Sequence, residues 1–265
     1  VQRLEGGSCS FRASQVKLDY LRSPEFHRKG SALRGSIMML GPLMARFGQA
    51  AIPQPGGDKI GRRRLDTHFS GLSSLGAVYA YNEACRCFEF RTPGLKGTYI
   101  HLDEASVTGT ANILMAAVMA EGTTTLFNAA CEPYLVQLCR MLNRMGARIS
   151  GVGSNLLTIE GVSSLKGTEH EMQSDMIEVG SFIGLAAMTR SQITLENVRE
   201  EDLGIIPEVF RRLGIRMEFS GDGLDIPAQD IYEINTFMDG LILTIADAPW
   251  PGFTPDLISI ALVTA

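Results

Sequence analysis

The sequence lacks any apolar run long enough to cross a bilayer, which takes about 20 residues. Its longest obvious one, Ile113 to Ala120, stops at Glu121. The opening residues, VQRLEGGSCSF, lack the apolar centre of a signal peptide. A surplus of positive charge is missing too, because the formal net charge is −5, so no global basic field attracts nucleic acid. We therefore expect neither a membrane nor a nucleic acid as partner.

Motifs for phosphate and metal binding are also absent. No G-x-G-x-x-G follows a strand and no G-x-x-x-x-G-K-[ST] occurs, which argues against phosphoryl transfer by a P-loop. No cluster has the spacing of metal ligands. The five cysteines are an odd number, and Cys85 and Cys87 lack the C-x-x-C spacing, so we expect reduced, partly buried thiols rather than a metal site. These cysteines are Cys9, Cys85, Cys87, Cys131 and Cys139.

What is present is an ordinary globular composition with an internal repeat. The 265 residues are 45% hydrophobic and 20% charged, enough for one large domain or two smaller ones. Three segments each begin with an apolar stretch rich in Ala, Leu and Met, continue into a β-prone run, and then have an amphipathic helix and a hairpin. The β-prone runs are QAAI, TTTLFNA and SQITLENV.

Glycines fix the period of this repeat. Gly76, Gly146 and Gly214 each follow an amphipathic helix and lie 70 and 68 residues apart. A glycine at this place lets the backbone turn left-handed and stop the helix. The sequence therefore predicts an α-β-α-β-β unit of about 70 residues, repeated three times.

The first helix of each unit is apolar on nearly all sides, as in ILMAAVMA, so it must be surrounded. We expect the units to pack around these helices with their sheets outside, as an α/β fold of the inside-out barrel type with roughly threefold pseudosymmetry. Residues 1–13 are typical of the closing hairpin of an earlier unit, and residues 256–265 of the opening helix of a further one. Because the chain begins and stops inside repeats, we expect it to be part of a longer protein.

Five segments in collinear order resemble the enolpyruvyl transferases, and the similarity runs along nearly the whole chain. The family fold has two domains, each of three such units around buried helices. The resemblance implies that residues 1–177 are most of one domain and residues 178–265 part of the second. The segments are LRGSIMMLGPLMARFGQA, PGGDKIGRRRLDTHFSGLSSLGA, AEGTTTLFNAACEPYLVQLC, LTIEGVSSLKG and FTPDL.

The members that act on UDP-N-acetylglucosamine are the most similar. The resemblance thus implies transfer of enolpyruvate from phosphoenolpyruvate to the 3′-hydroxyl of UDP-N-acetylglucosamine, with release of phosphate, in the cytoplasm of a bacterium. This reaction is the first committed step of peptidoglycan precursor synthesis, and it needs neither a metal nor an organic cofactor. Both substrates are polyanions, so fixed cations are needed to hold them together.

Candidate residues follow from the motif match. Guanidinium groups suit phosphate and carboxylate oxygens, whereas without the match a basic run is more often a solvated loop. The segment DEASVTGTANI, with Ser106, Val107 and Thr108, matches the loop that contacts the uridine diphosphate in the family. Glu104 and Thr108 depart from the family there, at positions where Lys and Gly are frequent. The substrate-binding candidates are Arg34, Arg63, Arg64, Leu65, Asp66, Thr67, His68, Ser106, Val107 and Thr108.

Asp58 occupies a loop position where most family members have a cysteine. The reaction needs a proton on the methylene carbon of phosphoenolpyruvate, and a thiol or a carboxylic acid of raised pKa can supply it. We expect Asp58 to be this general acid, and the enzyme to resist epoxide antibiotics that alkylate the usual thiol. The alternative is a turn residue.

Asp256, in PWPGFTPDL, matches the aspartate that deprotonates the sugar hydroxyl in the family. Its structural alternative is a helix N-cap after proline. Two other functions stay open for the chain: transfer to shikimate 3-phosphate, and a module that binds a UDP-sugar without turnover. A chain cut short at both ends is expected to bind weakly and turn over nothing. The oligomeric state is left open.

Overall fold

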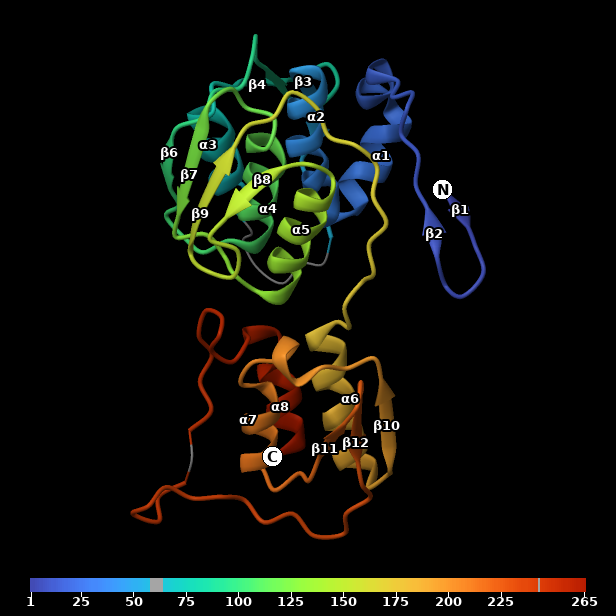
Figure 1. Cartoon of the computed structure of the whole chain (residues 1–265), viewed down its shortest axis with the longest axis vertical. Helices are drawn as coiled ribbons and strands as arrows, with labels where there is room; N and C mark the ends of the chain where they lie inside the picture. The colour runs from blue at the N-terminus through green and yellow to red at the C-terminus, as the bar shows by residue number, and fades with distance from the viewer. Residues whose placement is uncertain (58–63, 243) are drawn as a thin grey trace.

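The computed structural model describes residues 1–57, 64–242 and 244–265 (Figure 1). A small antiparallel hairpin, β1 (Gln2–Arg3) and β2 (Cys9–Ser10), comes first and turns at Gly6 and Gly7, as expected. Three helices follow it: η1 (Leu18–Arg22), α1 (Pro24–Ala32) and η2 (Arg34–Met39). Within these described ranges, no helix is long and apolar enough to span a membrane.

Three α-β-α-β-β units follow, which confirms the predicted repeat. The first is α2 (Leu40–Phe47), β3 (Gln49–Pro53), α3 (Asp66–Ser74), β4 (Val78–Asn82) and β5 (Cys87–Arg91). The second is α4 (Val107–Ala117), β7 (Thr123–Phe127), α5 (Pro133–Arg144), β8 (Arg148–Ser150) and β9 (Leu156–Glu160). The third is α6 (Met176–Thr189), β10 (Ile193–Glu196), α7 (Ile206–Arg212), β11 (Glu218–Ser220) and β12 (Gly223–Ile226), with η3 (Glu200–Asp202) before α7.

Each unit builds its sheet in the same order, with its last strand in the middle. The orders are β3-β5-β4, β7-β9-β8 and β10-β12-β11, all antiparallel. The short strand β6 (Tyr99–His101) adds to the second sheet, parallel to β7. Three copies of one topology are strong evidence of a repeated unit.

The second helix of each unit ends in one and the same motif. Gly76, Gly146 and Gly214 have φ of 95°, 104° and 84°. In each case the next residue donates its N–H to the carbonyl five residues back, as Ala77 does to Leu72 at 3.0 Å. This is the Schellman motif that satisfies the last carbonyls of a helix, and it confirms the role predicted for the three glycines.

The buried side chains gather in two main clusters rather than around three equivalent helices. One cluster contains α2, α3, α4 and the first two sheets, and α4 is buried over most of its length. The other contains α6, α7 and α8 (Ile258–Thr264), which follows η4 (Pro255–Leu257). Only the first two units share a core, because the extended residues 161–175 carry the third unit away from them (Figure 1).

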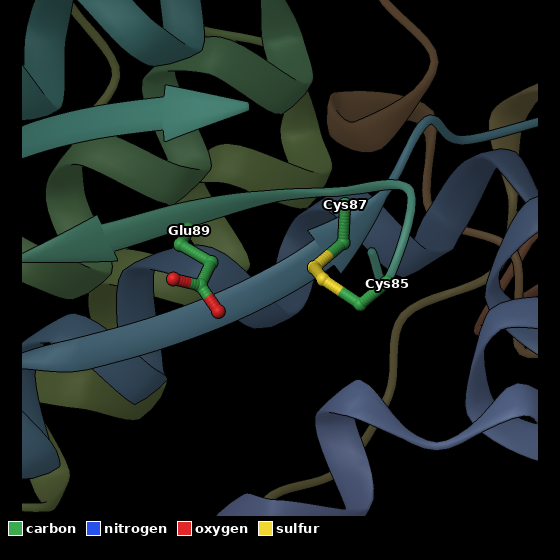
Figure 2. Close-up of side chains that lie close together, drawn as sticks. All are labelled: Cys85, Cys87 and Glu89. Atoms are coloured by element: carbon green, nitrogen blue, oxygen red, sulfur yellow. A yellow bond between two sulfur atoms is a disulfide. The ribbon is translucent and has the colours of Figure 1, made fainter. Parts of the chain in front are cut away.

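The expectation of five reduced thiols is wrong, because Cys85 and Cys87 form a disulfide (Figure 2). Residues two apart on a strand are separated by about 6.6 Å, near the upper limit for a disulfide. Here the Cα atoms are 5.4 Å apart because Cys85 lies in the turn between β4 and β5. Asn82 and Arg86 shape this turn, since the Asn82 carboxamide accepts the Ala84 N–H and Arg86 has φ of 51°. Cys9, Cys131 and Cys139 are free thiols.

Candidate active site

The starts of α3 and α4 lie against each other and place most of the predicted substrate-binding residues together. Ser106 is the N-cap of α4, and its Oγ accepts the N–H of Gly109 at 3.2 Å. A Cβ on Gly109 would lie 2.9 Å from Cγ2 of Thr67, so only glycine allows this approach. Val107 and Thr108 form the first turn of α4 beside it. Helix N-termini carry partial positive charge, so two adjacent ones favour an anion.

Arg34 and Arg64 meet at the edge of these helix starts. The Arg34 Nη2 donates to the carbonyl of Arg64 at 3.0 Å, across thirty residues of sequence. Gly57 lies beside Arg34 with φ of 103°, and a Cβ there would be 3.2 Å from the Arg34 Cβ. The half-buried Arg34 is thus fixed by its neighbours, as a guanidinium that recognises an anion must be.

Two carboxylates orient the Arg64 side chain. Its Nε donates to Asp66 Oδ2 at 2.8 Å, and its Nη2 lies 3.9 Å from Asp103 Oδ2. All three side chains are more than half exposed, so these pairs steer the guanidinium rather than stabilise the fold. Asp103 also lies 3.2 Å from the hydroxyl of Thr67, which is 3.0 Å from Glu104. Arg34, Arg64, Asp66, Thr67 and Asp103 are called the arginine cluster below.

His68 lies behind the arginine cluster, in the interior. Its ring is 1% exposed, with Nδ1 2.8 Å from Asn112 Nδ2 and Nε2 3.2 Å from Thr108 Oγ1. The Asn112 amide can only donate, so Nδ1 accepts and the proton is on Nε2. Burial lowers the pKa of His68 to about 4, and the charge of Arg34 adds to this. The neutral ring joins α3 to α4, and Leu65, half-buried before α3, packs on the same core.

Asn112 is a residue that sequence reasoning missed. It is fully buried in α4, where its Nδ2 donates to the Ile37 carbonyl at 2.9 Å and its Oδ1 accepts the Gly41 N–H at 2.8 Å. With the contact to His68, one side chain ties η2, α2 and α3 to α4. Its signal was a single carboxamide in a helix whose other residues are apolar or threonine.

Asp256 lies in the other half of the structure. It is exposed in η4, whose N-cap is Thr254, so the alternative of an N-cap aspartate is not what the structure has. Its charge reaches Tyr134 of α5: burial, Glu132, Asp256 and Asp175 together raise the pKa of Tyr134 to about 12. Tyr134 packs against the core that contains α8, and the thiol of Cys131 is 3.8 Å from the Trp250 carbonyl. The start of α5 therefore meets the segment before Asp256.

Glu132 lies at the same junction, as the N-cap of α5. Its Oε2 is buried and has no hydrogen-bond partner among the described residues. Burial raises the pKa of its carboxyl, and backbone N–H groups partly oppose this. The junction thus collects Glu132, Tyr134 and Asp256 from both halves.

The predicted residues therefore fall into two groups and a remainder. Arg34, Arg64 and the starts of α3 and α4 come together and suit anionic oxygens. Asp256 acts on Tyr134 through its charge, and offers a carboxylate that can accept a proton. Asp58 and Arg63 lie outside the described residues. Two cavities, of 780 and 320 Å³, are lined by other residues, around Arg216 and around His170.

Comparison with known proteins shows which family and which relatives the chain resembles. Residues 20–263 match the protein family described as EPSP synthase (3-phosphoshikimate 1-carboxyvinyltransferase). The chain is 66% identical to a UDP-N-acetylglucosamine 1-carboxyvinyltransferase of Bacteroides fragilis, over 97% of this chain and 59% of that protein. It is 62% identical to one of Porphyromonas gingivalis, over 100% of this chain and 61% of that protein. The chain thus spans about three-fifths of the length of these relatives.

Solved structures support the fold alone, because their sequences are distant. The enolpyruvyl transferase NikO from Streptomyces tendae superposes with a TM-score of 0.63 at 17% identity, over 78% of this chain and 49% of that chain. An EPSP synthase from Acinetobacter baumannii gives 0.54 at 24% identity, over 75% and 47%. The predicted α/β fold of enolpyruvyl-transferase type is confirmed.

Proposed function

Because the chain belongs to the family of EPSP synthase (3-phosphoshikimate 1-carboxyvinyltransferase), we propose that it is part of a UDP-N-acetylglucosamine 1-carboxyvinyltransferase. The enzyme would transfer enolpyruvate from phosphoenolpyruvate to the 3′-hydroxyl of UDP-N-acetylglucosamine and release phosphate. The observation that carries this proposal is 62 to 66% identity to proteins of that name, over 97 to 100% of the chain. The reaction would supply peptidoglycan synthesis in the cytoplasm.

The arginine cluster and the two helix starts would hold the anionic groups. Arg34 and Arg64 are fixed by neighbours, so little side-chain entropy is lost on binding. Arg63 would add a third guanidinium. Ser106, Val107 and Thr108 would offer the backbone of the α4 start to a phosphate. Glu104, near this group, takes a place where Lys is frequent in the family, so the nucleotide would depend more on the arginines.

Two carboxyl groups would move the protons. Asp256 would accept the proton of the 3′-hydroxyl as its oxygen attacks C2 of phosphoenolpyruvate, while Asp58 protonates the C3 methylene. The adduct would then return a proton from its methyl group to the Asp58 carboxylate and expel phosphate, which restores the double bond between C2 and C3. The phosphate would take up the proton held by Asp256, so both carboxyl groups regain their starting protonation states. Neither step needs a metal ion.

We propose residues 1–177 and 178–265 as parts of two domains that meet at the junction of Tyr134 and Asp256. Two separate cores support this division, because each half buries its own apolar side chains. The arginine cluster is in one half and Asp256 in the other, so both halves would have to face the same substrates.

The test is phosphate release from phosphoenolpyruvate, measured on a version of the protein extended to the full length of its relatives. We expect release with UDP-N-acetylglucosamine and none with shikimate 3-phosphate. Release with shikimate 3-phosphate alone would identify the other transferase of the family. Binding of UDP-N-acetylglucosamine without any release would identify a binding module instead.

A further inference from the structure

The turn between β4 and β5 holds a second group of reactive side chains, which the proposed reaction does not use. Cys85 lies in this turn, Cys87 begins β5, and Glu89 follows on the same face of β5 (Figure 2). One ligand atom of each, the two sulfurs and a carboxylate oxygen, lie within 4.8 Å of one another. No other group of three or more such side chains comes this close among the residues that the structure describes.

We infer that Cys85 and Cys87, once reduced, form with Glu89 a binding site for a thiophilic divalent cation such as Zn²⁺. Two thiolates and one carboxylate are ligands that zinc accepts, with Zn–S distances of about 2.3 Å and Zn–O distances of about 2.1 Å. Ligands of tetrahedral zinc are roughly 3.7 Å apart, so the two sulfurs would have to separate once the disulfide is reduced, while the carboxylate oxygen is already within 4.8 Å of both. Water would fill the fourth position.

Burial and ion pairing prepare these ligands. Cys87 is 1% exposed, whereas Cys85 and Glu89 are half-buried, so the cation would enter beside Cys85. The Arg22 Nε donates to Glu89 Oε1 at 2.7 Å and holds the carboxylate in place. Such outer partners orient metal ligands in known sites. The Arg91 Nη2, 3.7 Å from Glu89 Oε2, also offsets the negative charge that two thiolates would add.

The disulfide and the cation exclude each other, so the site depends on reduction. An external thiolate attacks the more accessible Cys85 sulfur, which breaks the S–S bond and releases the Cys87 thiolate. A second thiol then resolves the mixed disulfide, so two small thiols are oxidised to one small disulfide and the protein gains two thiols. Binding of M²⁺ replaces their two protons, which pass to solvent.

The experiment compares the oxidised and the reduced chain, free of metal, with Co²⁺ and Zn²⁺ as probes. The two states are verified by thiol counts of three and five, since Cys9, Cys131 and Cys139 are free in both. We expect the reduced chain alone to give the intense sulfur-to-cobalt charge-transfer band, at one Co²⁺ per chain, and Zn²⁺ to abolish it. A band of equal intensity in both states, or no band in the reduced state, would overturn the proposal. This comparison uses the unsubstituted chain only.

Substitutions then assign the ligands. Cys87→Ser and Cys85→Ser should each weaken Zn²⁺ binding at least tenfold in competition with a chromogenic chelator, and Glu89→Gln about tenfold. Cys9→Ser is the matched control, because Cys9 is an exposed thiol on a different hairpin. If Cys9→Ser lost binding while Cys87→Ser kept it, the site would lie elsewhere. Far-UV circular dichroism of each variant checks that it is folded.

Discussion

The Nδ2 amide of Asn112 lies 2.8 Å from Nδ1 of His68, and these two buried polar residues are 44 positions apart in sequence. The same carboxamide binds the backbone of Ile37 and Gly41. This network lies directly behind the arginine cluster, since Thr67 precedes His68 in α3. The position of the helix starts therefore depends on polar contacts made inside the core.

Asn112→Leu should destabilise the protein strongly. The substitution leaves the Gly41 N–H and the His68 Nδ1 without their partner inside the core, and each such loss costs about 1–3 kcal/mol. The Ile37 carbonyl keeps the Leu40 N–H but loses its second donor. We expect the free energy of unfolding to fall by at least about 2 kcal/mol, measured by urea denaturation. Ser70→Ala, an exposed change on α3, is the control and should stay within about 0.5 kcal/mol. Equal effects of both would contradict the network.

The buried His68 should make stability depend on pH. Its pKa is about 4 in the folded protein and about 6.5 when unfolded, so between these values the unfolded state binds the extra proton. Stability therefore falls as the pH drops from about 6.5 to about 4, by up to about 3 kcal/mol, and this contribution is absent above pH 6.5.

Urea denaturation at pH 7 and pH 4.5 measures this effect, because carboxylates contribute equally to wild type and variant. The difference between the two pH values should be smaller in His68→Leu than in the wild type by about 2 kcal/mol or more. His101→Gln, at an exposed histidine, should keep the wild-type difference. If His68→Leu lost as much stability between pH 7 and pH 4.5 as the wild type, His68 would not titrate in this way.

The helix ends were predictable from sequence because their signal is local. Gly146 follows an amphipathic helix directly, and a positive φ at that place is a property of a few neighbouring residues. The contacts of Asn112 are not local, since its partners come from three other elements. The Cys85–Cys87 disulfide was mispredicted for a related reason: it depends on β4 ending at Asn82, and strand ends are the least predictable part of a strand.

The two halves of the candidate site also differ in how much of each could be predicted from the sequence. The segment with Arg34 and Arg64 was found by its resemblance to a family, and the structure brings these residues together. The effect of Asp256 on Tyr134 could not be predicted from the sequence, because it depends on how the two cores meet. A motif identifies residue types, whereas the junction between cores is a matter of tertiary packing.

Gly146→Ala should test the helix-end motif. Nothing lies within 4 Å of a Cβ at Gly146, so its φ of 104° is the source of strain. A left-handed conformation costs an alanine about 1–2 kcal/mol, and we expect this loss in the free energy of unfolding. Gly94→Ala is the matched control: the space there is equally open, but φ is not in the positive region. It should be neutral or slightly stabilising, so a similar loss at both glycines would refute the argument.

Asp256→Asn should abolish turnover in a full-length version while the fold is retained. The carboxamide cannot accept the proton of the attacking hydroxyl, and loss of a general base typically costs a factor of about 10²–10⁴ in kcat. The measurement is phosphate release at saturating substrates, with the melting temperature as the check on folding. Asp247→Asn, another exposed aspartate of the same half, should keep wild-type turnover. Turnover of Asp256→Asn near that of Asp247→Asn would remove Asp256 from the reaction.

Asp58 predicts how the proposed enzyme would respond to fosfomycin, an epoxide antibiotic expected to alkylate a cysteine at this place. A carboxylate is a much poorer nucleophile than a thiolate, so the full-length enzyme should keep its activity and its intact mass in the presence of the drug. Asp58→Cys should gain the mass of one drug molecule and lose turnover with time. Asp58→Ser is the control, because it contains the same five native cysteines and should gain no mass. An adduct on the unsubstituted enzyme, mapped to Asp58 by peptide mass spectrometry, would show that this carboxylate reacts as the thiol does.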